Sequence, residues 1–427
     1  MGNDQMKYFW FVFFAALLVI GCISPGVVPE QPEPNPPLIE PNQPIPEPNP
    51  PEPTSIISAQ IVGDPVFLQK FGDSWFSTWA DDDKLYISWG DGTGRGDCYP
   101  EAYNNLKSPF CDSSCGTPES FLFCDIFCST FACNTCYAPC TLTDAGLVSL
   151  EGSAPYFIDC QDECIMSLHI PTGTPLFDKD IDPGTLRNDK PSSLLFYNGI
   201  LYWAGHSPAG HPDFGYLAYS NDYGHTWTEV ENSPWTTDSV FRVLMFINMG
   251  RNYELNQDGY VYAFGIGSEE AWTKDINLHG REENEEKTVY LTRVPKDSIL
   301  DYGRYEYYVT IDENGNPIWS GNEADATPLE GLETIQTASA MYHEGTGRYL
   351  FLTASPGALF EAPQPWGPWR KVAPLFNEGD NPAWKLGGYV PGIISKDAGP
   401  NYFYFTLAGG PSRYQLHIGK IEMELNN

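Results

Sequence analysis

Positively charged residues are scarce in this sequence, with 23 Lys and Arg against 56 Asp and Glu in 427 residues and a formal net charge of −33. Nucleic-acid binding needs a basic surface that neutralises phosphates, and so few cations cannot easily supply one. The one long apolar run has only 13 residues, which is too short to span a bilayer comfortably. The composition therefore argues against a nucleic-acid partner and against a multi-span membrane protein.

Common catalytic and nucleotide-binding signatures are also missing. The sequence contains no P-loop, no G-x-S-x-G or H-E-x-x-H element and no Rossmann fingerprint. This argues against the commonest hydrolase and nucleotide-binding classes, and we expect no cofactor and no metal. What the chain does have is 14% aromatic residues, 40 Gly and 38 Pro. Aromatic residues favour strands, so this composition predicts an all-β, turn-rich protein.

The N-terminal segment reads as an export signal. The apolar run Tyr8–Ile20 follows Lys7 and precedes Gly21-Cys22, which is typical of a lipoprotein signal peptide over residues 1–22 with Cys22 as the lipidated residue. The alternative is an uncleaved signal anchor with an incidental cysteine. Residues 23–55 then form a Pro/Glu-rich linker, with 12 prolines between Pro29 and Pro53. The linker could otherwise be a PxxP ligand. We expect the protein on the extracytoplasmic side of the cell envelope, attached to the membrane through its lipid anchor only.

Ten further cysteines are confined to 67 residues: Cys98, Cys111, Cys115, Cys124, Cys128, Cys133, Cys136, Cys140, Cys160 and Cys164. Some spacings would fit a zinc site, but no histidine lies between the first and the last of them. Because an exported chain meets an oxidising compartment, we favour five disulfides in an insert over residues 95–165.

A turn pair followed by a short aromatic strand recurs along the rest of the chain. It appears at residues 83–87, 198–203, 258–262, 346–351 and 398–404. Such pairs supply the positive φ that hairpins need. Five units of this kind predict a five-bladed β-propeller over residues 56–427, with the cysteine-rich insert in its first blade. A double β-sandwich is the structural alternative. Residues 220–227, SNDYGHTW, match the Asp-box of propeller hairpins.

Two aspartates flank the first hairpin. The segment from Asp73 to Asp91 is nearly symmetric about Asp82, which places Asp73 opposite Asp91 and Trp75 opposite Trp89. Directly opposed Cβ atoms lie about 4.5–5.5 Å apart. Two carboxyl groups at that distance share a proton, which gives the acid and the anion that glycoside cleavage requires. The alternative is that both aspartates cap strand ends and face solvent. A bulge would shift the register by one and spoil the geometry.

Other candidates carry less information. Trp75, Lys190 and Tyr253 are predicted to contact substrate, Trp75 by stacking on a sugar face, although the last two are also ordinary loop residues. The run of three aspartates at 81–83 fits either a calcium site or a solvated turn. His206 and His211 lack the acidic or cysteine pattern of a metal site.

Several phrases together resemble a family of secreted five-bladed propellers catalogued as a domain of unknown function. They are GDSW at 72–75, TWAD at 78–81, WGDG at 89–92, KPS at 190–192, DGYVY at 258–262, RVPKD at 293–297 and EAPQPWGPW at 361–369. The resemblance spans residues 61–423. Characterised members of that family are endo-D-arabinanases, so it implies a furanoside polysaccharide as substrate and maps the family's acidic pair onto Asp73 and Asp91. The cysteine-rich insert departs from the family pattern.

These observations lead to one hypothesis and two rivals. The chain is expected to be a surface-anchored, monomeric glycoside hydrolase acting on a polysaccharide or glycoconjugate, with Asp73 and Asp91 as acid and base or nucleophile. The first rival is a non-catalytic propeller of the envelope that binds carbohydrate or protein. The second is a structural envelope protein whose insert mediates adhesion.

Overall fold

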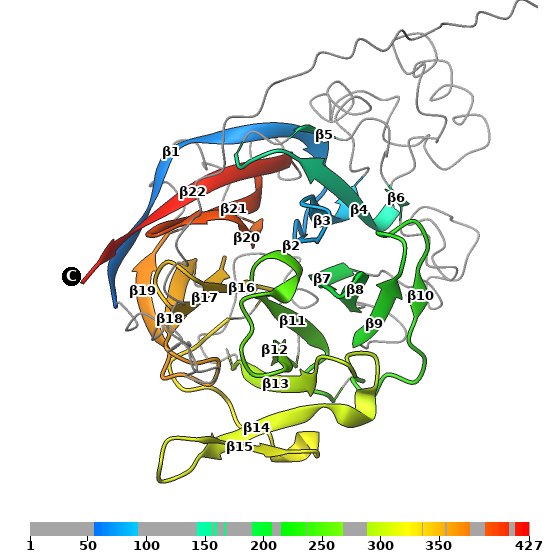
Figure 1. Ribbon diagram of the computed structural model, residues 1–427, viewed down its shortest axis with the longest axis vertical. Coiled ribbons are helices and arrows are strands. Elements are labelled where there is room, and N and C mark those ends of the chain that lie inside the picture. The colour runs from blue at the N-terminus through cyan, green and yellow to red at the C-terminus, as the bar shows by residue number, and fades with distance from the viewer. Residues whose placement is uncertain are drawn as a thin grey trace, which may run out of the picture. The chain divides into compact units, whose positions relative to one another are not determined.

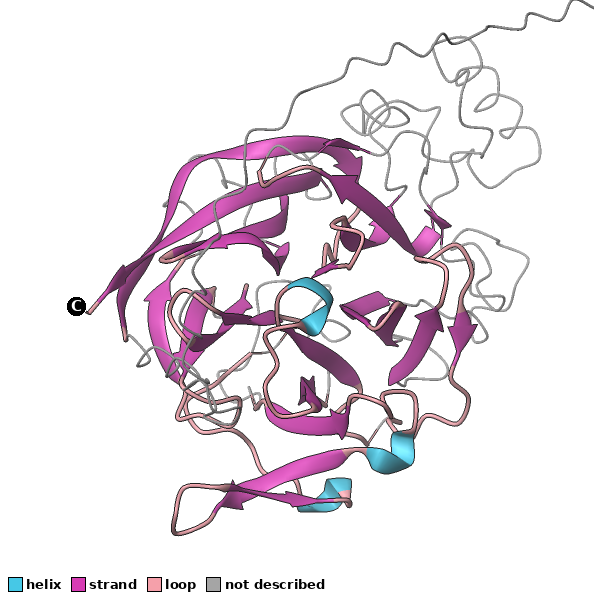
Figure 2. Ribbon diagram, in the orientation of Figure 1, coloured by secondary structure: helices cyan, strands magenta, loops and turns pink. Residues whose placement is uncertain are grey.

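Strands dominate the regular structure of the chain, as Figure 2 shows. The computed structural model describes residues 55–92, 143–155, 158–159, 166–167, 190–206, 215–236, 238–267, 288–334, 336–354, 357–375, 389–409 and 415–426. Within these ranges the helices are three 3₁₀ turns, η1 (Arg251–Tyr253), η2 (Tyr302–Arg304) and η3 (Glu323–Asp325). None of these described helices has the length and hydrophobicity of a membrane crossing. The prediction of an all-β chain is confirmed.

The strands of the described residues form five antiparallel meanders, numbered here in chain order. Meander 1 contains β2 (Ser77–Trp79), β3 (Leu85–Gly92), β4 (Thr143–Glu151) and β5 (Ile158–Asp159), and β6 (Met166–Ser167) also pairs with β4. Meander 2 contains β7 (Lys190–Tyr197), β8 (Ile200–His206), β9 (Gly215–Ser220) and β10 (Thr228–Glu229). Meander 3 contains β11 (Val243–Asn248), β12 (Tyr260–Ile266), β13 (Tyr290–Pro295), β14 (Glu306–Ile311) and β15 (Pro317–Ser320).

The last two meanders are built from residues 339–425 and one N-terminal strand. Meander 4 contains β16 (Ser339–His343), β17 (Arg348–Thr353), β18 (Ala358–Ala362) and β19 (Arg370–Pro374). Meander 5 contains β20 (Tyr389–Gly399), β21 (Tyr402–Gly409), β22 (Gln415–Leu425) and, as its outer strand, β1 (Ile56–Phe71). Strands β11 and β16 pair in parallel over two residues, which joins meanders 3 and 4 into one sheet.

The first strands of the meanders contact one another in a closed ring in the order β2, β7, β11, β16, β20 and back to β2. Figure 1 shows these five strands nearest the common centre. Buried hydroxyl groups link neighbours in the ring: Thr78 Oγ1 accepts from Phe196 N (2.9 Å), Ser193 Oγ from Phe246 N (3.0 Å) and Ser339 Oγ from Ile393 N (2.9 Å). Asn248 Nδ2 adds donations to the main-chain oxygens of Ser77 and Leu194.

The recurring turn phrase forms the hairpins that the sequence predicted. Each phrase leads into the second strand of a meander, namely β3, β8, β12, β17 and β21. Asn198 and Gly199 both have positive φ, 53° and 79°, which gives the tight turn between β7 and β8. The third strands of the five meanders are β4, β9, β13, β18 and the long β22. Local turn chemistry therefore identified these hairpins correctly.

The described residues belong to one compact unit that spans 50–427. Its core consists of four clusters of buried apolar side chains, the largest of which lies mainly in meanders 2 to 4. The signal peptide, Cys22, the linker up to residue 54 and all ten cysteines of the insert lie outside the described residues. The predictions made for them stay predictions.

Candidate functional site

The two ends of the ring differ in the polar and ionisable side chains that lie there. At one end, called here the turn end, the first strands finish and turn into the second strands. At the other, the start end, the first strands begin. Contacts at the turn end show that all five first strands finish together there. Lys396 of β20 reaches the turn after β2, Asn252 after β11 reaches the turn after β7, and His343 of β16 reaches the turn before β21.

Polar contacts between meanders tie the turn end together. Arg251 donates to the main-chain oxygen of Asp81, so that η1 of meander 3 reaches meander 1. Tyr223 of meander 2 donates to the Asp81 carboxylate at 3.0 Å. Lys396, only 3% exposed, lies 2.9 Å from the Asp83 carboxylate and also donates to the main-chain oxygen of Asp83. The polar contacts at this end therefore stabilise the packing of neighbouring meanders.

The three consecutive aspartates at the turn end each have a protein partner. Lys396 hydrogen-bonds Asp83 and lowers the pKa of that carboxyl, assisted by a 2.9 Å donation from Trp79 Nε1. Asp82 accepts from the Tyr86 hydroxyl at 2.8 Å. Among the described residues no group of three or more His, Cys, Asp or Glu could hold a metal ion. The three side chains bind Tyr223, Tyr86 and Lys396 and thereby hold the turn in place.

Ionisable residues gather at the start end. Asp73 precedes β2 and is 2% exposed, Lys190 begins β7, and Arg242, 3% exposed, directly precedes β11. His206, 2% exposed, ends β8 opposite Lys190. Buried ionisable groups concentrate at functional sites because binding and catalysis need charges that water does not screen. The start end is therefore the better candidate site.

The hydrogen bonds between first strands show how far each of these residues lies from the middle of the ring, and the distances along the strands are similar. Thr78 lies beside Phe196, and five residues earlier on the two strands stand Asp73 and Pro191. Ser193 lies beside Phe246, and three residues earlier stand Lys190 and Val243. The sequence therefore brings a carboxylate, a lysine, an arginine and a histidine from meanders 1 to 3 to one end of the ring.

The predicted pairing of Asp73 with Asp91 is wrong. Near the turn the register is as expected, with Ser77 opposite Ile87 and Trp79 opposite Leu85. Further along, Asp73 pairs with Gly90, and the two residues exchange main-chain hydrogen bonds of 2.7 Å each. The strand that carries Asp73 thus contains one extra residue. Asp91 lies one position beyond Gly90 in β3, and its side chain is outside the described part of the structure.

The shift has a local cause in Ser88. Its hydroxyl donates to Ser74 O at 3.0 Å and accepts from Phe76 N at 3.2 Å, in the place where ladder bonds would otherwise form. Ser74 has φ 52°, in the left-handed region. An extra residue on one strand, together with a residue in the left-handed φ region, is typical of a β-bulge.

Trp75 and Tyr253 are core residues, so the prediction that they contact substrate is wrong for both. Trp75 is fully buried, and its Nε1 donates to Gly72 O at 2.9 Å. Tyr253 is 2% exposed, and its hydroxyl accepts from Tyr262 N at 3.2 Å; burial raises the Tyr253 pKa well above its usual value. The sequence did not reveal this, because the burial of each side chain depends on how separate meanders pack against one another.

Lys190 lies at the start end, where its predicted contact with substrate stays a prediction, and two further residues at the same end were not predicted. Its side chain is half-buried at the start of β7. The two further residues are Arg242, to which the sequence pattern assigns no role, and His206, which the sequence offers only as a candidate metal ligand. A usable signal existed: Lys190 and His206 are the first and last residues of the β7–β8 hairpin, and Asp73 and Arg242 stand before the first strands of their meanders.

Residues 197–409 match the model of a family described as "Domain of unknown function (DUF4185)". This stretch, just under half of the chain, agrees with the resemblance drawn from the sequence phrases. It begins after Lys190, so Asp73, Asp91 and the cysteine-rich insert lie outside it. No curated protein matches the chain.

Solved structures that resemble the chain share little sequence with it. A GH43_1 enzyme from Xanthomonas citri complexed with xylose is 13% identical, with 86% of this chain and 93% of that chain covered and a TM-score of 0.42. An α-L-arabinofuranosidase from Podospora anserina in complex with cellotriose is 10% identical, with 87% and 98% covered and a TM-score of 0.39. An α-L-arabinanase from Penicillium chrysogenum complexed with arabinobiose is 10% identical, with 86% and 98% covered and a TM-score of 0.34. Such distant likenesses assign no substrate and no residue role to this chain.

Proposed function

We propose that this chain is a glycoside hydrolase whose acid pair is Asp73 and Asp91. The observation that carries the proposal is the burial of Asp73 at the start end, where two main-chain hydrogen bonds hold it against Gly90. Asp91 is the next residue of β3. Opposed Cα atoms lie about 4.5–5.5 Å apart and consecutive ones 3.8 Å, so the Cα atoms of the two aspartates are about 6–7 Å apart. The bulge removes the direct opposition of Asp73 and Asp91 and leaves the two residues adjacent along the backbone only, because consecutive residues of a regular strand project to opposite faces.

The chemistry needs one proton donor and one anion. One aspartate gives its proton to the glycosidic oxygen as the bond to the anomeric carbon breaks. The other either attacks that carbon directly or takes a proton from the attacking water. Carboxyl groups about 5–5.5 Å apart give retention, and about 6.5–9.5 Å give inversion. The neighbouring Lys190 and His206 are suited to hydrogen-bond sugar hydroxyl groups at the same end of the ring.

The substrate class follows from the sequence resemblance. We propose an endo-acting enzyme on a furanoside polysaccharide or a glycoconjugate that contains one. The fold that carries the site is proposed to be a five-bladed β-propeller with a disulfide-rich insert in its first blade. The closed ring of five first strands supports this reading. A lipid on Cys22 would anchor the enzyme, as a monomer, on the extracytoplasmic side of the membrane.

A panel of polysaccharides incubated with the full chain tests the proposal. We expect reducing ends to be released from one furanoside polymer and release to fall by at least about 1,000-fold in both Asp73→Asn and Asp91→Asn, a loss typical of removing an essential catalytic group. Asp297→Asn is the matched control, since Asp297 is an exposed residue on the turn after β13. Unchanged release by the two site variants would refute the assignment of the acid pair.

The second candidate function is a binding module of the envelope that cleaves nothing. The observation in its favour is that Asp73 faces Gly90 instead of a second carboxylate. It predicts saturable binding of a glycan or protein that survives the loss of either aspartate, with no product from any polymer. The panel separates the two functions when binding and product are measured on the same samples.

A further inference from the structure

The N-terminal strand closes the last meander from outside. Among the described strands β1 pairs only with β22, beginning with Ile56 opposite Leu425, and Asn426 N donates to Ser55 O at 2.9 Å. The register of this pair is interrupted three times along β1. Strand β1 therefore holds to a single neighbour by an irregular ladder, and its free end is the point at which the preceding 54 residues join the folded unit.

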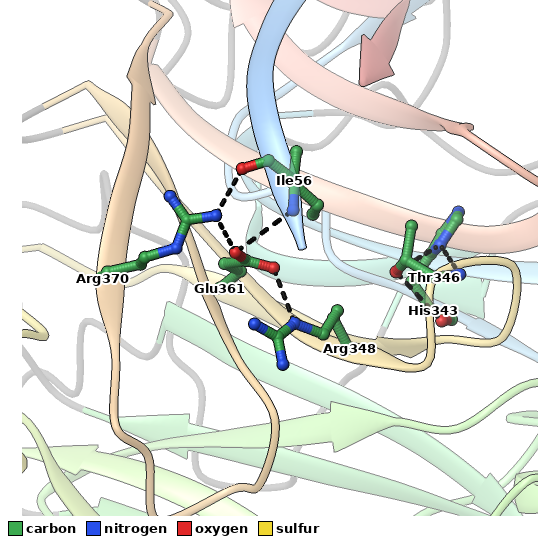
Figure 3. Close-up of polar contacts among 6 residues, drawn as sticks. All are labelled: Ile56, His343, Thr346, Arg348, Glu361 and Arg370. Carbon is green, nitrogen blue, oxygen red and sulfur yellow. Dashed lines mark hydrogen bonds and ion pairs between the residues drawn. The ribbon is translucent and has the colours of Figure 1, made fainter. Parts of the chain in front are cut away.

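A buried carboxylate sits at that point. Glu361 of β18 is fully buried, and Figure 3 shows it between Arg348, Arg370 and the main chain of Ile56. Arg348 Nε donates to Glu361 Oε2 at 2.9 Å, and Ile56 N donates to Oε1 at 3.4 Å. Arg370 bridges the two segments, because its guanidinium donates both to Glu361 and to Ile56 O.

Both main-chain polar groups of Ile56, the N–H and the C=O, are hydrogen-bonded to this cluster. They bind a charged pair that belongs to meander 4, while the strand itself belongs to meander 5. The Ile56 side chain is also fully buried, in a cluster that includes Leu350 and Leu359 of meander 4. Hydrogen bonds to charged groups are stronger than neutral ones, and burial protects them from water.

We propose that Glu361, Arg348 and Arg370 form a latch for strand β1. The latch fixes Ile56, the first residue of the strand, to the neighbouring meander. It prevents the strand from peeling off β22 from its free end, which is where any tension on the preceding residues would act. Peeling would open the junction between the two chain ends of meander 5 without first disturbing meanders 1 to 3.

Hydrogen exchange of the full chain, read by mass spectrometry, tests the latch. The variant is Glu361→Gln, which keeps the size of the side chain but places an NH₂ donor where an arginine or Ile56 N–H also donates. Removing one partner of a buried ion pair is strongly destabilising, so amides of residues 56–62 should exchange about 100-fold faster or more. Amides of β12 in meander 3 should keep their rates.

The matched control is Glu306→Gln, which breaks the Arg293–Glu306 pair on meander 3 at 2.8 Å and touches no residue of β1. It should leave exchange in residues 56–62 unchanged. Should Glu361→Gln fail to fold, Arg370→Gln removes only the half-exposed partner and should speed exchange in this segment about 10-fold, the size of one charged hydrogen bond. Unchanged exchange at 56–62, or an equal acceleration in every strand, would overturn the latch.

Discussion

Asp73 and Gly90 exchange two main-chain hydrogen bonds of 2.7 Å, and this pair sets the geometry of the candidate acid site. A symmetric hairpin would place Asp73 opposite Asp91. The actual pair leaves the carboxyl-bearing residue opposite a glycine, with no side chain above it on β3. Asp73 is thereby offset from Asp91 by one residue step along β3.

The bulge that creates this offset depends on the Ser88 hydroxyl. Ser88→Ala removes a buried donor to Ser74 O and an acceptor for Phe76 N. We expect the free energy of unfolding to fall by about 1 kcal/mol, because two buried hydrogen bonds are lost while Phe76 N keeps its 3.0 Å donation to Ser74 O. Urea unfolding measures it. Ser298→Ala, at a partly exposed turn, is the control and should change it by less than about 0.5 kcal/mol; equal losses would contradict a structural role for Ser88.

Strand positions were predictable because they follow from local chemistry. Asn198-Gly199 and Asp258-Gly259 permit positive φ, and the aromatic residues that follow favour extended backbone. The register at Asp73 was not predictable, since it depends on Ser88, a residue 14 positions from Ser74 whose hydroxyl competes with the ladder. The alternation of residue types along a strand does not show that a side-chain hydroxyl will replace a main-chain hydrogen bond.

The candidate site was predicted in part for the same reason. Asp73 and Lys190 stand at strand beginnings, which turn phrases locate. The burial of Trp75 depends on how separate meanders pack, which a single strand does not encode. Arg242 and His206 become notable only when the ring aligns the starts of β2, β7 and β11.

Lys396 is expected to matter more for stability than its partner Asp83. Lys396→Met keeps the length of the side chain but loses the donations to the Asp83 carboxylate and main-chain oxygen. We expect a loss of about 1–2 kcal/mol in unfolding free energy. Asp83→Asn should cost under about 1 kcal/mol, since that carboxylate is 58% exposed and water screens it. Urea unfolding of both variants measures the two losses of unfolding free energy. A larger loss for Asp83→Asn would contradict the greater importance of Lys396.

Asp222 should give the stability of the β9–β10 turn an acid dependence. Desolvation raises its pKa, but hydrogen bonds from Ser220 and Thr226 outweigh this and lower it to about 2. The unfolded value is near 3.9, so the stabilisation is complete above that pH and is lost as pH falls towards 2. Asp222→Asn should therefore cost about 1 kcal/mol at pH 7 and clearly less at pH 3. Urea midpoints at the two pH values measure it, and a cost that does not change with pH would contradict it.

His343 should make the protein less stable at mildly acidic pH. Its Nε2 lies 3.1 Å from Tyr402 O and therefore donates, which leaves Nδ1 to accept from Thr346 N and Oγ1 (Figure 3). The ring is fully buried, and desolvation lowers its pKa below 6.5.

Because the folded state resists a proton that the unfolded chain takes up near pH 6.5, the unfolding free energy should decline as pH falls from about 7 to 5. His343→Gln offers a similar donor and acceptor but does not titrate, so its decline over this range should be shallower. His417 also has a pKa lowered by burial, and it is present in both proteins. The difference in slope between them therefore isolates His343. Urea midpoints measured every half pH unit provide the two slopes, and identical slopes would show that the imidazole at position 343 takes up no proton in this range.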